Sequence, residues 1–200
     1  MNDENGAERS TRVRDPDRAE KILAAAARLF AVQGFHAVSL ADIGREAGIV
    51  GSGIYRHFDN KLAVLVALLD QSLAELMERT DELQAVDLPP EEAMGLLVQH
   101  QVDFCIRHRL SVQLYRTEFT ALTPDDARRL RRQQRRYIEE WVGTLGEMRP
   151  ELTAAKARAL VHVTIGAIQS IVTHDSGLDT DELTSMLGAV AQRCLTTQLP

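Results

Sequence analysis

Two short helical segments separated by a glycine turn constrain this 200-residue chain most strongly. Ser39 stands three residues before Asp42, which is the spacing of a helix-capping pair, and Ile43 follows on the side expected to be buried. Gly48 ends that segment, and the stretch GIVGSGIYRHF occupies residues 48–58. A short helix, a turn and a second short helix form a helix-turn-helix, whose second helix lies in the major groove of DNA.

The rest of the chain also has the apolar spacing of helices. Leucines at positions 62, 65, 69, 73 and 76 form one stripe on a helix predicted from Lys61 to about Leu83, capped by Asp59-Asn60. Pro90 and Pro124 stand at further helix starts, and Thr123, Thr153 and Thr180 are predicted caps. We find no alternating strand pattern of useful length. The sequence predicts an all-α protein of about nine helices, with a mobile arm (1–15), a three-helix head (16–61) and a helical body (62–200).

Charge and cysteine content narrow the class of protein. The net charge is −6, but residues 1–61 contain nine Lys/Arg and nine Asp/Glu, so the acidic excess lies entirely in the body and does not exclude nucleic acid. Cys105 and Cys194 fall within apolar helical patterns and are expected to be free thiols. No run approaches the length of a membrane span, and the first residues are too polar for a signal peptide. We expect a cytoplasmic protein without a membrane partner.

Residues 24–65 carry a pattern of fixed spacing that resembles the TetR family of bacterial transcription regulators. The matching residues are Leu29, Phe30, Gly34, Phe35, Ser39, Asp42, Ile43, Ala47, Gly48, Tyr55, His57, Phe58, Lys61 and Leu65. The resemblance implies a DNA-binding head on a body that dimerises and holds an effector pocket. Two heads about 34–36 Å apart would then read a palindromic operator in double-stranded DNA.

Recognition of DNA is assigned to the second half of the motif. The predicted DNA-binding residues are Arg45, Gly51, Ser52, Gly53, Tyr55, Arg56, His57 and Lys61. Tyr55, His57 and Lys61 would contact phosphate, whereas Ile54 and Phe58 are expected to be core residues. Arg56 would bind guanine O6 and N7, or clamp a phosphate instead.

The glycines depart from the family pattern. Many relatives have Ser-Lys-Gly-Thr where this chain has Val50-Gly51-Ser52-Gly53, and Gly44 replaces the usual alanine. Few side chains remain to read bases, so phosphate contacts and DNA shape should contribute more to recognition. Because glycine weakens helices, Gly53→Ala is expected to stabilise the head slightly.

The last two helices, about 153–173 and 179–197, correspond to the usual dimerisation region of the family. The predicted interface residues are Leu160, Thr164, Ala167, Ile168, Ile171, Leu183, Leu187 and Val190, although an ordinary intramolecular core would give the same pattern. Polar or aromatic groups within apolar helices are the candidates for an effector pocket. They are His100, Phe104, Tyr115, Glu118, Phe119, Tyr137, Trp141 and His162, each of which a satisfied core position would also explain.

No catalytic arrangement is visible, and Cys105 with His108 lacks a convincing further metal ligand, so we expect neither an enzyme nor a metal site. Residues 107–141 resemble a subset of actinobacterial members of the family, some of which respond to acyl-CoA thioesters. Arginines near an apolar cavity would pair with the nucleotide phosphates, or would simply be solvated on their helix. The expectation is a ligand-responsive, homodimeric repressor without a cofactor, released by a small hydrophobic effector such as an acyl-CoA. The alternative is an all-α small-molecule-binding protein with little sequence-specific DNA binding.

Overall fold

The computed structural model describes residues 16–49 and 51–199, and the arm predicted at residues 1–15 lies outside this range. Within these residues the chain forms eight α-helices and three short 3₁₀ helices, and it contains no strand. The predicted all-α class is therefore confirmed, with eight α-helices in place of about nine.

The head consists of α1 (Pro16–Gln33), α2 (Leu40–Glu46) and the 3₁₀ helix η1 (Gly51–Arg56), packed on the first turns of α3 (Lys61–Gln84). Ile22, Ala26 and Phe30 on one face of α1 are buried, as their three- and four-residue spacing indicates. Gly34 has a φ of +81°, a conformation that L-residues rarely adopt, and it ends α1 with a hydrogen bond from its N–H to the Phe30 carbonyl (2.9 Å). The chain can therefore turn sharply from α1 into α2.

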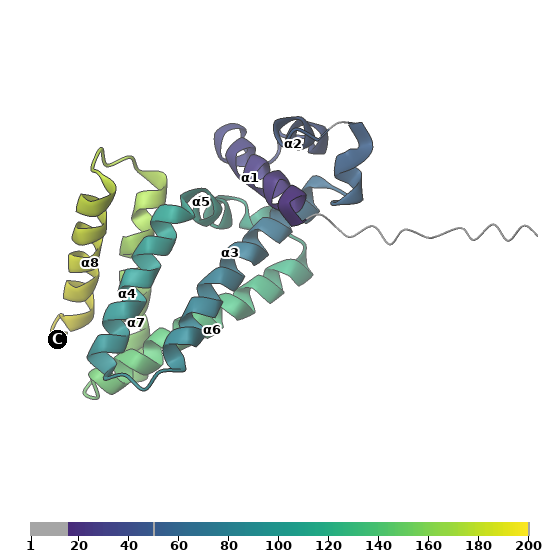
Figure 1. Ribbon diagram of the computed structural model, residues 1–200. Coiled ribbons are helices and arrows are strands. Elements are labelled where there is room, and N and C mark those ends of the chain that lie inside the picture. The colour runs from purple at the N-terminus through teal and green to yellow at the C-terminus, as the bar shows by residue number, and fades with distance from the viewer. Residues whose placement is uncertain (1–15, 50, 200) are drawn as a thin grey trace, which may run out of the picture.

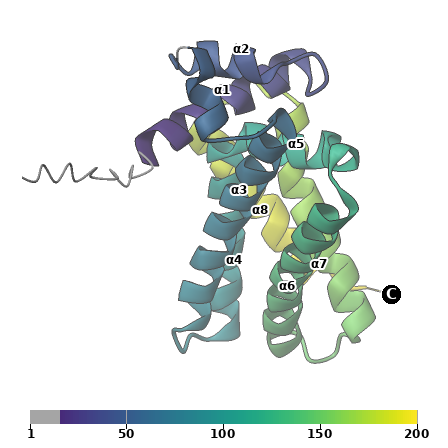
Figure 2. The same cartoon turned by 90° about the vertical axis from the view of Figure 1, so that its right-hand side faces the viewer.

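The body contains the remaining helices. They are α3, α4 (Pro90–Arg107), α5 (Arg109–Thr117), η2 (Phe119–Ala121), α6 (Pro124–Met148), α7 (Ala154–Gln169), η3 (Ser170–Thr173) and α8 (Thr180–Thr196). Helix α4 contacts α3, α6, α7 and α8, whereas α8 lies at the edge against α4 and α7. Figures 1 and 2 show the head at one end of this bundle, above the short helix α5, which contacts α1. The body thus supports the head through α3 and α5.

Side-chain caps fix where most of these helices begin. Asn60 Oδ1 accepts a hydrogen bond from the Ala63 N–H (2.9 Å) at the start of α3, and Thr123 and Thr153 cap α6 and α7 as predicted. The predicted cap at Thr180 is wrong by one residue, because Asp179 Oδ1 accepts from the Glu182 N–H (2.9 Å) and Thr180 is already helical.

One continuous apolar core runs through head and body. Trp141, Leu145 and Leu130 of α6 are fully buried, together with Leu65 of the α3 leucine stripe. At the far end, Arg149 Nη1 donates to the carbonyls of Leu195 and Thr197 (2.8 Å each) and ties the end of α6 to the end of α8. Among the helices described here, none is both long enough and apolar enough to cross a membrane.

Candidate nucleic-acid interface and effector cavity

Helix α2 is held by a reciprocal cap. Ser39 Oγ accepts a hydrogen bond from the Asp42 N–H (3.1 Å), and Asp42 Oδ2 accepts from the Ser39 N–H (3.0 Å). The Ser39 hydroxyl also donates to Asp42 Oδ2 (2.5 Å), and this hydrogen bond, followed by that from the Ser39 N–H, lowers the pKa of Asp42, with a smaller contribution from the Arg45 guanidinium. The predicted capping pair is confirmed, and it fixes where the chain enters α2.

The segment that follows the turn is a 3₁₀ helix and not the α-helix expected of a recognition element. The six residues Gly51–Arg56 make up η1. A 3₁₀ helix rises about 2.0 Å per residue, whereas an α-helix rises about 1.5 Å, so η1 is narrower and more extended than an α-helix of the same length. Ile54 is 1% exposed and anchors η1 in the core, as predicted, and Phe58 is half-buried against that core. The two glycines lower the helical propensity of this segment, which favours the short, tighter form.

The other side chains of η1 face solvent. Tyr55 is 56% exposed, and Ser52 and Arg56 are also exposed, whereas His57 is half-buried. Arg45, the candidate on α2, has a largely exposed side chain that makes an ion pair with Asp42 (3.1 Å). Gly51, which begins η1, and Gly53 supply backbone to the same short element. The predicted contacts of these residues with DNA remain predictions.

Lys61 is used differently from what its position in the motif suggested. Its Nζ donates to the carbonyl oxygens of Phe35 (2.8 Å), His36 (3.0 Å) and Val38 (3.0 Å), and it lies 4.7 Å from the centre of the Phe35 ring. An ammonium group has three donors, and all three are occupied here. In this structure Lys61 holds the loop between α1 and α2 onto the start of α3, and its contact with phosphate remains a prediction.

The two unusual glycines of the motif have different surroundings. A Cβ atom at position 53 would lie 2.8 Å from Ile49 Cγ2, closer than real Cβ contacts come, whereas one at position 44 would make ordinary contact with Ile54 Cβ (3.4 Å). This close contact predicts that Gly53→Ala destabilises the head, opposite to the expectation from helix propensity. Gly53 is required because η1 packs closely on Ile49, and sequence propensity alone does not reveal such a contact.

A cavity of about 60 Å³ lies inside the body, and residues of α3, α4, α5, α6 and α7 line it. We call it the effector cavity. Its polar lining was not predicted from the sequence: the residues concerned are Ser72, Gln101, Ser111, Arg116, Gln134 and Gln169. The Tyr137 hydroxyl donates to Gln101 Oε1 (2.5 Å), and the Tyr115 hydroxyl donates to Gln134 Oε1 (2.9 Å). Polar groups are thus fixed in pairs on otherwise apolar walls.

Three of the eight predicted pocket residues, Phe104, Tyr115 and Tyr137, line this cavity. Burial raises the pKa of both tyrosines, so they act as neutral hydrogen-bonding groups. Trp141 is fully buried behind Tyr137, with ring centres 6.1 Å apart.

The other four candidates lie elsewhere, because helical spacing does not show which side of a helix faces a cavity. His162 is exposed on α7, and neither Glu118 nor Phe119 lines the effector cavity; the guanidinium of Arg131 stacks on the Phe119 ring at 4.7 Å. His100 lines a separate groove between α3 and α4, where burial, followed by the charge of Arg79, lowers its pKa.

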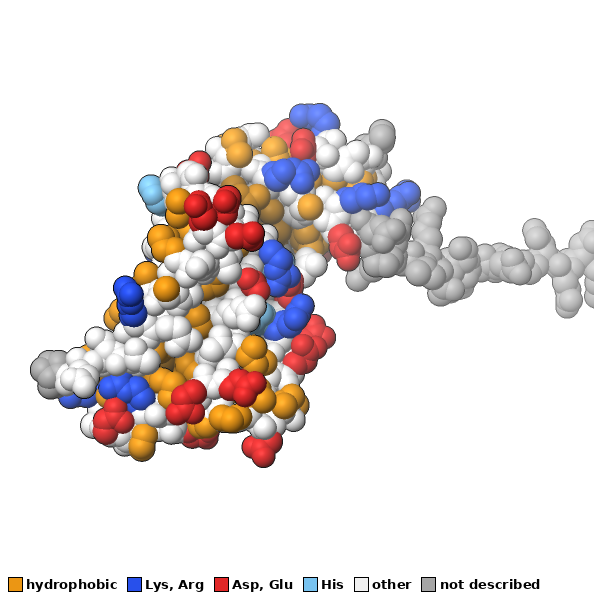
Figure 3. Space-filling model, turned by 60° about the vertical axis from the view of Figure 1, so that its left-hand side comes forward, with side chains coloured by type: hydrophobic (Ala, Val, Ile, Leu, Met, Phe, Trp, Pro, Cys, Tyr) orange, Lys and Arg blue, Asp and Glu red, His pale blue; other side chains and the backbone are white. Residues whose placement is uncertain are grey.

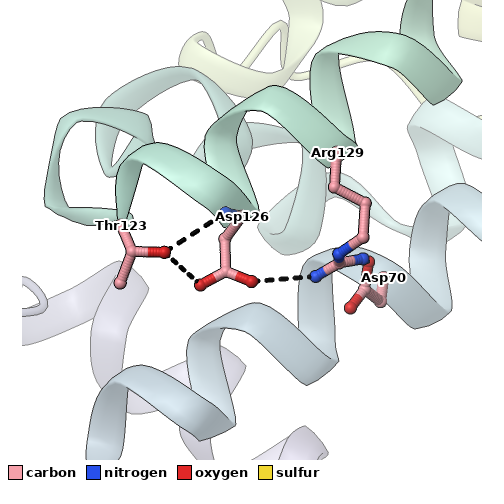
Figure 4. A network of polar contacts seen from close by, with 4 residues as sticks. All are labelled: Asp70, Thr123, Asp126 and Arg129. Atoms are coloured by element: carbon pink, nitrogen blue, oxygen red, sulfur yellow. Dashed lines mark hydrogen bonds and ion pairs between the residues drawn. The ribbon is translucent and has the colours of Figure 1, made fainter.

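An ion-pair network fastens the start of α6 to α3 (Figure 4). The Thr123 hydroxyl donates to Asp126 Oδ2 (2.6 Å), Arg129 Nη2 donates to Asp126 Oδ1 (3.1 Å), and Arg129 also pairs with Asp70 of α3. The hydrogen bond from Thr123, followed by that from Arg129, lowers the pKa of Asp126. Since these groups are partly exposed, the network contributes geometry more than stability.

Residues 22–68, in the head and the start of α3, match the family described as bacterial regulatory proteins, tetR family. The HTH-type transcriptional repressor KstR2 of Rhodococcus jostii is 28% identical over 129 residues, which are 64% of this chain and 63% of KstR2. Residues 22–68 thus carry the sequence pattern of the TetR family. The alignment thus spans less than two thirds of KstR2.

Solved TetR-type structures have the same fold. A TetR-family regulator from Bordetella parapertussis is 25% identical, with a TM-score of 0.78 over 89% of this chain and 94% of that one. The transcriptional regulator FadR from Bacillus subtilis, solved in complex with stearoyl-CoA, is 20% identical, with a TM-score of 0.71 over 88% of this chain and 97% of FadR. These comparisons show that the chain has the fold of TetR-type regulators.

The region predicted for dimerisation is divided between core and surface. Six predicted residues are buried within the protomer itself: Leu160, Thr164, Ile168, Ile171, Leu183 and Leu187. An intramolecular core would explain this burial as well, so the contact of these residues with a second subunit remains a prediction. Ala167 is half-buried, and Val190 is 41% exposed. Val163 (59% exposed) and Met186 (45% exposed) are further apolar residues that face solvent on α7 and α8. Figure 3 shows apolar side chains among charged ones on the α8 side of the body.

Cysteine and histidine do not converge on a metal site in the part of the chain that the structure describes, where no three His, Cys, Asp or Glu residues gather. Cys105 accepts a hydrogen bond from Gln101 Nε2 (3.1 Å), and burial raises its pKa to about 11. His108 stacks on Phe104 at 4.8 Å between ring centres, and its Nε2 lies 3.0 Å from Glu75 Oε1.

Proposed function

We propose that this chain is a homodimeric repressor that binds a palindromic operator and leaves it when a small hydrophobic effector enters the body. The observation that carries the proposal is the exposure of Ser52, Tyr55 and Arg56 on an element whose remaining side chain, Ile54, is fully anchored in the core. Polar side chains held in this way on a rigid base can meet DNA without first reorganising.

In the proposed complex, η1 enters the major groove. The Arg56 guanidinium binds guanine O6 and N7, a contact that contributes roughly 1–3 kcal/mol of discrimination, and Tyr55 donates to a phosphate. The backbone at Gly51 and Gly53 approaches the groove closely because no side chain intervenes. Lys61 acts indirectly in this proposal, by holding the α1–α2 loop against α3.

The proposed dimer joins two copies through the exposed sides of α7 and α8. Val163, Met186 and Val190 supply apolar contact area, and Gly166, which is also exposed, allows the helices to approach closely. A two-fold axis beside these helices would present two heads to successive turns of one face of the DNA.

The proposed effector is an acyl-CoA thioester, whose acyl chain enters the effector cavity. The apolar walls of this cavity suit such a chain, and FadR, which shares the fold, binds stearoyl-CoA. A volume of about 60 Å³ is far below the roughly 300–1,000 Å³ of typical ligand pockets, so the conformation described here is a closed one. The effector would favour an expanded conformation and shift the population away from the form that binds DNA.

DNA binding is tested by fluorescence anisotropy with a duplex taken from upstream of the chain's own coding sequence and a scrambled duplex as control. Arg56→Ala should weaken binding about tenfold or more and relax the preference for one base pair. Arg132→Ala, which removes an exposed arginine of the body on α6, serves as the matched control. Equal affinity of the wild-type protein for the two duplexes would favour the alternative, a small-molecule-binding protein that does not recognise a DNA sequence.

Dimerisation and effector release need separate measurements. Sedimentation of the wild-type protein should give a dimer, and Val163→Glu should give a monomer whose helical content is unchanged. Acyl-CoA thioesters of increasing chain length should displace the upstream duplex in the anisotropy assay. Failure of every chain length to do so, with DNA binding intact, would refute the proposed effector class while leaving the regulator itself supported.

A further inference from the structure

A second, larger hollow lies where the head meets the body. It has a volume of about 510 Å³, and residues of α1, of the middle of α3 and of the α4–α5 corner line it. We call it the junction groove. Ser72 of α3 and Ser111 of α5 line both this groove and the effector cavity. Two small, half-buried side chains therefore stand between the interior of the body and the surface beside the head.

The junction groove carries more positive than negative groups. Arg28, Arg107 and Arg109 line it, against Glu20 and Glu75. Glu75 is shared between Arg107 (3.2 Å) and His108 (3.0 Å), so one carboxylate serves two groups. Arg109 donates to the backbone carbonyl of His174. Within residues 16–49 and 51–199 no ion pair of Arg109 with a carboxylate is found. Arg28 pairs with Glu46, and Arg107 shares Glu75 with His108, so Arg109 is the guanidinium that an incoming anion would find without a carboxylate partner among the residues described.

We propose that the junction groove holds the anionic end of the effector, while its apolar chain passes between Ser72 and Ser111 into the effector cavity. This inference rests on the proposed function and names where that effector binds. The ligand class is an amphipathic molecule with an acyl chain and phosphate groups at the other end. The volume of the groove falls within the roughly 300–1,000 Å³ range of ligand sites, so it can take a nucleotide-sized group that the effector cavity cannot.

Such a ligand would contact head and body at once. Arg28 lies on α1, in the DNA-binding head, and its exposed side chain also pairs with Glu46 of α2 (3.3 Å). Arg107 and Arg109 lie at the corner between α4 and α5. An anion held by all three would change how α1 sits on α5, and its binding energy would then differ between the conformations with and without DNA.

The experiment measures binding of octanoyl-, dodecanoyl- and hexadecanoyl-CoA, free coenzyme A and the matching fatty acids to the full-length protein by isothermal titration calorimetry. Arg107→Gln and Arg109→Gln should each weaken binding of the tightest thioester about tenfold, and Arg28→Gln should also weaken it. Ser111→Leu should block the passage and reduce affinity for the thioester to that for free coenzyme A. Thermal unfolding of every variant reports whether it is folded.

The matched controls are Arg131→Gln and Arg132→Gln, both on the α6 side of the body, because neither residue lines the junction groove or the effector cavity. A loss of affinity in these variants, with the groove variants unaffected, would place the anionic end on that side and overturn the inference. Wild-type-like binding by folded Arg109→Gln and Ser111→Leu proteins would also overturn it, but would leave the proposed effector class intact. If no thioester or fatty acid bound the wild-type protein, the proposed effector class and the proposed role of the junction groove would both fail.

Discussion

The substitution Gly53→Ala tests how closely η1 packs on the segment before it. The new Cβ would lie 2.8 Å from Ile49 Cγ2, a branch atom close to its own backbone that cannot swing away freely. Forcing an extra methyl group into a packed site costs about 1–3 kcal/mol, whereas replacing glycine in a helix recovers about 0.5–1 kcal/mol. The net expectation is a loss of about 1–2 kcal/mol in the free energy of unfolding.

Gly44→Ala is the matched control, because the same chemical change there meets Ile54 at an ordinary contact distance of 3.4 Å. It should raise the free energy of unfolding by about 0.5–1 kcal/mol. For a chain of this size, 1 kcal/mol shifts the melting temperature by roughly 2–4 °C, so the two variants should move in opposite directions in a thermal melt followed by circular dichroism.

A double-mutant cycle assigns the effect to the contact itself. Ile49→Ala removes the Cγ2 atom, so Gly53→Ala should cost little or nothing in that background, and the coupling energy should be at least about 1 kcal/mol. DNA affinity should fall with Gly53→Ala, since either η1 or Ile49 must move. If Gly53→Ala raised the melting temperature as much as Gly44→Ala does, the argument from close packing would be refuted.

Three further predictions concern single groups. Lys61→Ala should lower the free energy of unfolding by about 2–3 kcal/mol in a denaturant titration, because three carbonyls lose a charged donor. Lys21 is exposed, so Lys21→Ala should change the free energy of unfolding little. Equal losses in the two variants would contradict the role given to Lys61. Iodoacetamide at pH 8 followed by peptide mass mapping should label half-buried Cys194 well before buried Cys105, whose pKa is raised to about 11; faster labelling of Cys105 would show that its environment is open. The folded-state pKa of Asp126 is lowered, so ionised Asp126 contributes to the free energy of unfolding above its ordinary pKa of 3.8, and this contribution is lost as the pH falls through the folded-state pKa. Asp126→Asn should therefore weaken the dependence of the free energy of unfolding on pH in the acid range. An unchanged pH dependence would argue against the network.

Local features of this fold could be predicted from the sequence, and contacts between distant segments could not. The caps at Ser39, Asn60, Thr123 and Thr153 involve groups within three residues of one another, so spacing alone indicates them. The contact of Lys61 with carbonyls more than twenty residues earlier depends on how α3 packs against the head, which spacing does not encode.

The same limit explains the errors in the body. Helix α7 has apolar residues on two sides: Leu160 and Ile168 face the core, and Val163 faces solvent. The sequence pattern does not show which of the two sides packs against other helices of the same protomer. Gln101 and Gln134 resemble ordinary surface residues in the sequence, yet they line the effector cavity because tyrosines from neighbouring helices bind them. A polar residue can be assigned to a cavity only after the partner that satisfies it is known.

Helix α3 also has a mechanical consequence. Its 24 residues span about 36 Å at 1.5 Å per residue, from the head to the far side of the effector cavity. Lys61, its first residue, fixes that end to the α1–α2 loop. A rotation of only about 5° around a pivot at the far end would therefore carry the head through about 3 Å, with little slack at the attachment. In the proposed dimer, helix α3 would act as a lever arm that converts a slight widening of the effector cavity into a change in the spacing of the two heads.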